Sequence, residues 1–169
     1  TFSPDQLEQI ESAFVHETPP NDGHRKNILK KWHNKLGVGL GKPVGIEQPC
    51  MAQEFVDEYG EYDGLPQRAT LGQKISVAGE IHAPAEFGGV GLARIEPAKK
   101  LGAAHLNGTS SYPVPNPDDL YFPAGFKTPK PVKLEGKRFS IDLDLRQPAG
   151  PGRYQVSVWG RYPGDKAFV

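Results

Sequence analysis

The spacing of the apolar residues changes near the middle of the chain, and this change constrains the fold more than any other feature. Between Leu7 and Phe14 apolar residues recur at steps of three and four, the spacing of one helix face. In the second half apolar and polar residues alternate, as in strands with one buried face. A polar, glycine-containing segment, 58–66, separates the two patterns. We therefore predict two domains, residues 1–63 and residues 64–169.

The first domain is predicted to contain two helices and a β-hairpin. Ser3 is placed as the N-cap of the first helix and is followed by a proline and then by Gln6, which completes a capping box. The prolines at 19–20 end this helix, because the residue before a proline is driven out of the helical region. A second, short helix follows. The apolar segments 36–40 and 50–56 then predict two antiparallel strands.

The second domain is predicted to be an all-β antiparallel sandwich of the immunoglobulin-like kind. Turn segments rich in glycine and proline separate its strands, and the whole chain holds 20 glycines and 17 prolines. The proline-rich stretch 105–131 is expected to be a long surface loop, and 162–169 is expected to enter a further strand that is cut short. The fold class is therefore α+β. Four segments have strand character, namely 74–81, 90–95, 139–145 and 154–159.

The charge balance argues against nucleic acid as a partner. Twenty basic and twenty acidic residues leave a formal net charge of zero, whereas nucleic-acid binding needs a clustered basic face. The basic run 30–35 is short and is expected to be a solvated helix end. No segment approaches the roughly 20 apolar residues of a transmembrane helix, and no signal peptide is visible. Cys50 is the single cysteine, so no disulfide forms within the chain.

His24 is the residue most suggestive of chemistry. It follows Gly23 at the start of the second helix, where the helix dipole disfavours the imidazolium form. A neutral imidazole there suits metal binding or proton acceptance, and Glu17 is close in sequence. The structural alternative is a simple hydrogen bond at a helix terminus. One histidine and one nearby glutamate fall short of a metal site, which needs at least three ligands.

Three motifs in this part of the chain occur together in a known family. They are Gly-His-Arg-Lys-Asn-Ile-Leu at 23–29, Leu-Gly-Val-Gly-Leu at 36–40 and Met-Ala-Gln-Glu-Phe at 51–55. In this order and spacing they resemble the C-terminal half of a CAP domain, the domain of cysteine-rich secretory proteins, antigen 5 and pathogenesis-related 1 proteins. The resemblance covers residues 7–59, about a third of the chain, and is closest to the bacterial extracellular branch.

The resemblance implies an α-β-α sandwich with a cleft that holds two histidines and two acidic residues, and some members bind a divalent metal such as zinc there. His24 matches the histidine of the family's Gly-His motif. Glu17 matches the acid that follows a helix aromatic by three positions, and Glu11 is a weaker candidate. Gln53 and Glu54 lie on the strand that the family places beside the cleft, although solvation of an edge strand would explain them equally well.

The other histidine and acid belong to the family's N-terminal half, which precedes the residues seen here. We therefore expect a fragment truncated at both ends, or else a degenerate CAP domain. The resemblance also implies an extracellular or periplasmic location. Because the hairpin would lack a neighbouring strand and a covering helix, we expect the first domain to be marginally stable.

Three functions are compatible with these features. The first is a secreted bacterial CAP-family protein whose cleft binds a small molecule, a lipid-like ligand or a metal, with the sandwich as an accessory module. It expects His24 and Glu17 to face one concave surface. The second is a metal-assisted hydrolase or peptidase, which needs a third ligand or base from Glu47, Glu54 or His16. The third is a structural or adhesive surface module, in which His24 is tied to backbone carbonyls. Because half of the family's tetrad is absent, the non-enzymatic interpretations are favoured.

Overall fold

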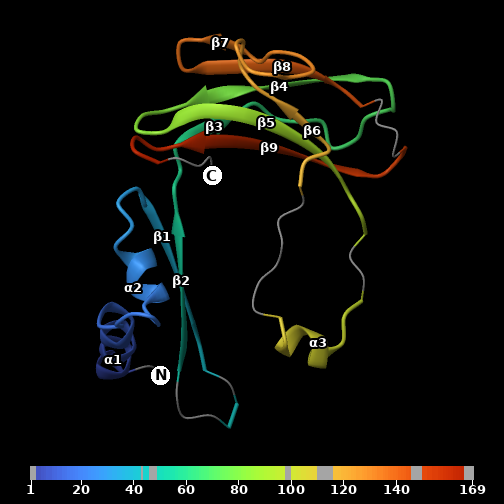
Figure 1. Cartoon of the computed structure of the whole chain (residues 1–169). Coiled ribbons are helices and arrows are strands. Elements are labelled where there is room, and N and C mark those ends of the chain that lie inside the picture. Colours follow the sequence, from blue (N-terminus) through green and yellow to red (C-terminus); the bar gives the residue numbers. More distant parts are fainter. Residues whose placement is uncertain are drawn as a thin grey trace. The chain divides into compact units, whose positions relative to one another are not determined.

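The structure is a computed structural model that describes residues 3–42, 44–45, 49–97, 100–109, 116–145 and 150–165. Within these ranges the chain forms three helices and nine strands (Figure 1). All sheets are antiparallel, and strands predominate over helices, which agrees with the predicted α+β class. The chain divides into two compact units, Thr1–Glu58 and Tyr59–Val169, which we call unit 1 and unit 2.

Unit 1 begins with the predicted helix. Helix α1 spans Pro4–Val15, and Ser3 caps it through the predicted capping box. The Gln6 amide donates to Ser3 Oγ at 3.3 Å, while Gln6 Oε1 accepts from the Ser3 amide at 3.4 Å. Helix α2 follows at Gly23–Ile28. The first helix was thus predicted from its cap and the prolines that follow it, and the second, short helix is present as expected.

The predicted hairpin completes unit 1. Strand β1 (Lys35–Gly41) pairs antiparallel with strand β2 (Cys50–Val56), and Val38 lies opposite Gln53. Burial alternates along β2, where Met51, Gln53 and Phe55 are half-buried and the residues between them are exposed. Every residue of β1 is exposed.

Unit 1 buries very few of its described side chains. Among its described residues only Asp22 is buried, and Lys26 Nζ lies 2.7 Å from the Asp22 carboxylate. No described apolar side chain of this unit reaches the same degree of burial. Burial of apolar surface is the main favourable term in folding, so unit 1 has little of it to offset its conformational entropy.

Unit 2 is built from two antiparallel sheets. One has the order β3-β4-β8-β7, formed by Gly60–Tyr62, Lys74–Ile81, Arg138–Asp144 and Lys133–Glu135. The other has the order β6-β5-β9, formed by Asp119–Tyr121, Glu86–Ile95 and Arg153–Arg161. The four segments predicted as strands correspond to β4, β5, β8 and β9.

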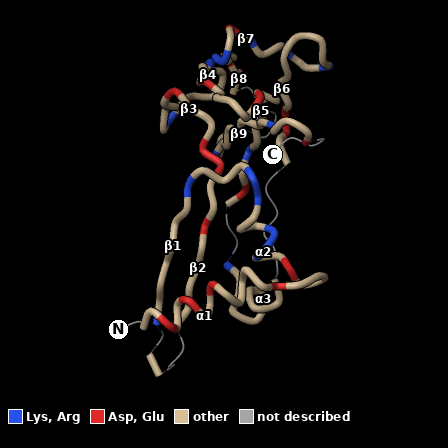
Figure 2. The backbone as a smooth tube through the Cα atoms, turned by 90° about the vertical axis from the view of Figure 1, so that its left-hand side faces the viewer, with Lys and Arg blue, Asp and Glu red and all other residues tan. Residues whose placement is uncertain are grey.

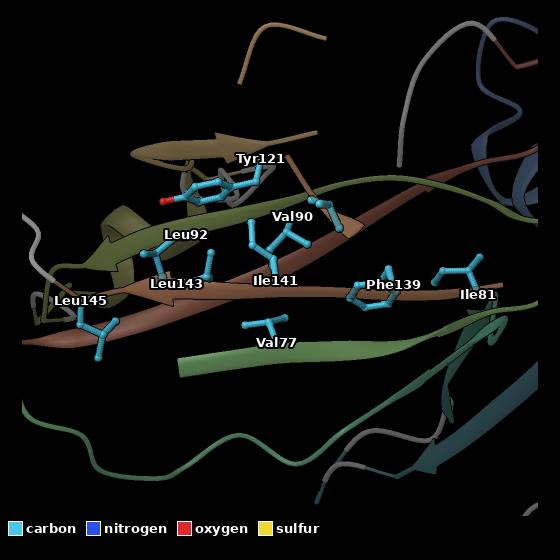
Figure 3. Packing of buried hydrophobic residues seen from close by; sticks show 10 residues of the cluster. Val77, Ile81, Val90, Leu92, Tyr121, Phe139, Ile141, Leu143 and Leu145 are labelled. Carbon is cyan, nitrogen blue, oxygen red and sulfur yellow. The ribbon is translucent and has the colours of Figure 1, made fainter. Parts of the chain in front are cut away.

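The two sheets of unit 2 share one apolar core. Figure 3 shows its side chains projecting between the strands of the two sheets. Phe139 of β8 is fully buried and stacks on Phe87 of β5, with 4.8 Å between ring centroids. Gly79 lies opposite Phe139 in the β4–β8 pairing, and a Cβ at Gly79 would be 3.1 Å from the Phe139 ring. Because Gly79 has no side chain, the Phe139 ring can pack directly against the backbone of β4.

Two expectations about loops are wrong. Gly60–Tyr62, expected within the interdomain linker, forms β3 and pairs with β4. The stretch 105–131, expected as one loop, overlaps helix α3 (Ala103–Asn107) and contains β6, which pairs with β5. A strand of three residues is too short to show an alternating pattern, so only pairing with a neighbour reveals it. Residues 110–115 and 166–169 lie outside the described residues.

Two surface properties follow from the sequence. Figure 2 shows basic and acidic positions mixed along the chain in both units, in keeping with the net charge of zero. Within the described ranges, none of the helices combines the length and apolar character needed to cross a membrane.

Candidate functional site

The structure brings His24 and Glu17 together. Glu17 lies in the connection between α1 and α2, and His24 lies in the first turn of α2. His24 Nδ1 is 2.6 Å from Glu17 Oε1. The other oxygen, Glu17 Oε2, accepts the backbone amides of His24 at 2.9 Å and of Arg25 at 3.3 Å. One carboxylate therefore holds both the ring and the backbone of His24.

This hydrogen bond determines the chemistry that remains open to His24. The bond to His24 holds the pKa of Glu17 below its ordinary value of 4.5, and the two backbone amides act in the same direction. An ionised Glu17 accepts the proton on Nδ1, so Nε2 is the ring nitrogen that this hydrogen bond leaves open. The His24 side chain is 62% exposed, so this second nitrogen has access to a ligand.

The ring of His24 is also held from one side. It stacks on Phe14 of α1, with 4.3 Å between centroids and 11° between planes. The Arg25 guanidinium donates to the carbonyl of Val15 at the end of α1, which ties the start of α2 to that helix. The position of His24 is therefore set by a stacked ring and by an anchoring carboxylate.

A small pocket lies beside this histidine. Its volume is about 200 Å³, and its walls come from α1, α2 and β2. At its edge the Gln53 amide donates to the Glu11 carboxylate, which links β2 to α1. The pocket has both apolar and polar walls, and its polar groups are the imidazole of His24 and the amides of Asn27 and Gln53. Its larger apolar lining residues are Phe14, Ile28, Met51 and Phe55.

The other candidate residues do not join this pocket. Glu54 is exposed and lies on the opposite face of β2 from Gln53, because successive residues of a strand point to opposite faces. His16 caps the end of α1 and its Nδ1 lies 2.8 Å from the Ser12 carbonyl. Glu47 lies outside the described residues. Within the part of the chain that is described, no cluster of three or more metal-ligating side chains exists.

A second histidine pair was missed from the sequence. His33 Nδ1 lies 2.5 Å from Asp57 Oδ1, and the two side chains are only 11% and 17% exposed. The His33 ring stacks on Phe55, a wall of the pocket, at 5.1 Å. The expectation of a solvated helix end at 30–35 is therefore wrong for His33. Asp57 is 24 residues away in sequence, so no local pattern could reveal the pair.

Comparisons with protein-family models, with curated proteins and with solved structures found no match to this chain. The assignment of a function therefore depends on the geometry described above and on the motifs at 23–29, 36–40 and 51–55.

Proposed function

We propose that unit 1 binds a small organic ligand in the pocket beside His24, and that the chain belongs to a secreted bacterial protein of the CAP type. In this proposal unit 1 is the C-terminal half of an α-β-α CAP sandwich, and unit 2 is an immunoglobulin-like accessory module. The protein acts outside the cytoplasm. The observation that carries the proposal is the combination of an oriented imidazole with an adjoining small pocket that has two phenylalanine side chains in its walls.

The size and lining of the pocket indicate the kind of ligand. A volume of about 200 Å³ lies below that of most sites for drug-sized molecules, whereas an apolar cavity of about 150 Å³ already accepts benzene. A single ring or a short alkyl chain therefore fits between Phe14 and Phe55. A hydrogen-bond donor on that ligand would meet Nε2 of His24, because Glu17 already engages Nδ1.

The described side chains do not fit a zinc site. Zinc in proteins takes three or four protein ligands, whereas among the described residues His24 has one nearby carboxylate, and that carboxylate is engaged by hydrogen bonds. The hydrolase alternative takes Glu17 as the acid–base partner of His24, which their hydrogen bond fits, but it also needs a further base or ligand. The structural alternative expects His24 to be tied to backbone carbonyls, whereas its Nδ1 bonds to the Glu17 carboxylate.

The test is an NMR titration of the full chain with phenol and, as a control ligand, toluene. Phenol is expected to shift the amide signals of Phe14, His24 and Gln53 and to bind about fivefold more tightly than toluene, because only phenol donates to Nε2. A His24→Ala variant is expected to lose this preference. His16→Ala removes a histidine of the same unit outside the pocket and is expected to leave it unchanged.

Two results would count against the proposal. One is the absence of shifts at the pocket with either ligand. The other is an equal affinity for phenol in the wild-type chain and in His24→Ala. A parallel titration with zinc chloride separates the metal alternative: micromolar binding that disappears in His24→Ala would favour a metal site over an organic ligand.

A further inference from the structure

A second pocket lies wholly within unit 2, at the lateral opening between its two sheets. Its volume is about 320 Å³, at the lower end of the range of small-molecule sites. The walls are aliphatic and come from one strand of each sheet, Val77 and Ala78 of β4 and Val156 and Val158 of β9. Val77 is 3% exposed and belongs to the core, so the pocket reaches from the surface to the interior.

The opening exists because β3 is short. Strand β3 pairs only with residues 79–81 of β4, which leaves the first part of β4 without a neighbour on that side among the described residues. The last residue of β3, Tyr62, and the chain that follows it, through Asp63 and Leu65, supply the mouth of the pocket. Tyr62 and Leu65 are 59% and 43% exposed, so apolar surface at the mouth remains in contact with water.

The mouth also carries a fixed polar group. The Asp63 amide donates to the Ala78 carbonyl at 2.9 Å, which ties this residue to the edge of β4. The Asp63 carboxylate accepts from Arg138 Nη2 through Oδ2 at 2.6 Å. A carboxylate has acceptor capacity on both oxygens, so Oδ1 can accept from a ligand while Oδ2 stays with Arg138.

The charges at the mouth select the head group. Asp63 is the charged side chain among the described residues that line the pocket, and Arg138 neutralises it. Because the two charges are already paired, a charged head group would lose part of its hydration at the mouth without gaining an unpaired counter-charge. A neutral hydroxyl loses less hydration and can donate to the free oxygen of the Asp63 carboxylate.

We propose that this pocket binds a slim aliphatic alcohol, with its alkyl chain between the two sheets and its hydroxyl group at Asp63. The alkyl chain contacts the four aliphatic wall residues, and Leu65 covers it from the side of the mouth. The site is independent of the pocket in unit 1, because its lining residues all belong to unit 2.

The test uses three eight-carbon ligands that differ only in the head group: 1-octanol, octanoate and octylammonium. NMR titration of the full chain is expected to shift the amides of Ala78, Val156 and Val158 with octanol. Octanoate and octylammonium are expected to bind about tenfold more weakly, because each loses hydration of its charge at a mouth whose own two charges are already paired. Absence of octanol shifts at these residues would overturn the proposal.

Two further variants test the pose, and both change surface residues that the fold does not bury. Leu65→Ala is expected to weaken octanol binding about fivefold through lost apolar contact. Leu71→Ala is the matched control, because Leu71 has a similar exposure of 41%, lies in the same connection and does not line the pocket. Equal weakening in the two variants would contradict the pose.

Asp63→Asn provides a signature that a purely structural role would not produce. The change removes the negative charge and leaves Arg138 without its carboxylate partner at the mouth. Octanoate is then expected to bind at least as tightly as octanol, which reverses the order seen with the unchanged chain. An unchanged order of head groups in Asp63→Asn would refute the assignment of the hydroxyl group to Asp63.

Discussion

Replacement of Phe139 by alanine tests the account of the core in unit 2. Phe139 is fully buried, stacks on Phe87 and occupies the space above Gly79, which has no side chain to fill a cavity. Loss of a buried phenylalanine costs about 3–5 kcal/mol in the free energy of unfolding, as lost transfer energy plus an unfilled cavity. We expect the upper part of this range, because the stacked ring of Phe87 would also lose its partner.

Urea unfolding measures this cost in unit 2 alone. The chain has two tryptophans, Trp32 in unit 1 and Trp159 on β9 in unit 2, so a Trp32→Phe background makes the emission report on unit 2. With a slope of about 2 kcal/mol per molar urea, a loss of about 4 kcal/mol lowers the unfolding midpoint by about 2 M.

Phe126→Ala is the matched control for this measurement. Phe126 belongs to the same unit, but its side chain is 66% exposed, so its removal is expected to change the free energy of unfolding by less than about 0.5 kcal/mol. Similar midpoint shifts for Phe139→Ala and Phe126→Ala would refute the reasoning. So would a loss below about 1 kcal/mol at Phe139, because it would mean that the core closes around the cavity at little cost.

Three further predictions follow from the same structure. In urea, the tryptophan of unit 1 is expected to report a lower unfolding midpoint than the tryptophan of unit 2, because unit 1 buries so little apolar surface. For the same reason the isolated residues 1–63 should show no cooperative unfolding transition. Coincident midpoints for the two tryptophans would contradict this prediction. Carbon-detected NMR should give Glu17 a pKa below 4.5, and this pKa should rise toward 4.5 in His24→Ala. The hydrogen bonds of the Glu17 carboxylate therefore stabilise the fold above about pH 4.5, and this contribution is lost as the pH falls through the lowered pKa. Gly79→Ala should destabilise unit 2 by about 1–3 kcal/mol in thermal unfolding, because its Cβ would lie 2.4 Å from the Glu61 carbonyl oxygen, whereas Gly64→Ala meets no atom within 4 Å and should change little.

The features predicted correctly are those that a short stretch of sequence encodes. The capping box at Ser3 placed the start of α1, and the prolines placed its end within a few residues of Val15. Alternation placed three long strands of unit 2, and the fourth candidate segment, 90–95, falls within β5. The structure also places His24 beside Glu17, the acid that the resemblance to CAP domains indicates, seven residues away in sequence. In each case the interaction is local, so the residues that make it are neighbours in sequence.

The features that were missed all depend on partners far apart in sequence. Strand β3 is recognisable only from its pairing with β4, and the His33–Asp57 pair joins the residues before β1 to the end of β2. Glu54 was a candidate beside the cleft, but the β1–β2 register turns Gln53 toward the helices and Glu54 away from them. A shift of one residue in that register would exchange the two side chains.

The sequence by itself determined the kinds of elements and the approximate positions of both helices of unit 1, of its hairpin and of the four long strands of unit 2. It did so because helix caps, proline breaks and apolar periodicity act over a few residues. Only the tertiary structure decided which face of β2 meets α1 and α2, and where the two sheets of unit 2 leave an opening. Both pockets depend on strand register and on the length of β3, which are set by the packing of residues distant in sequence.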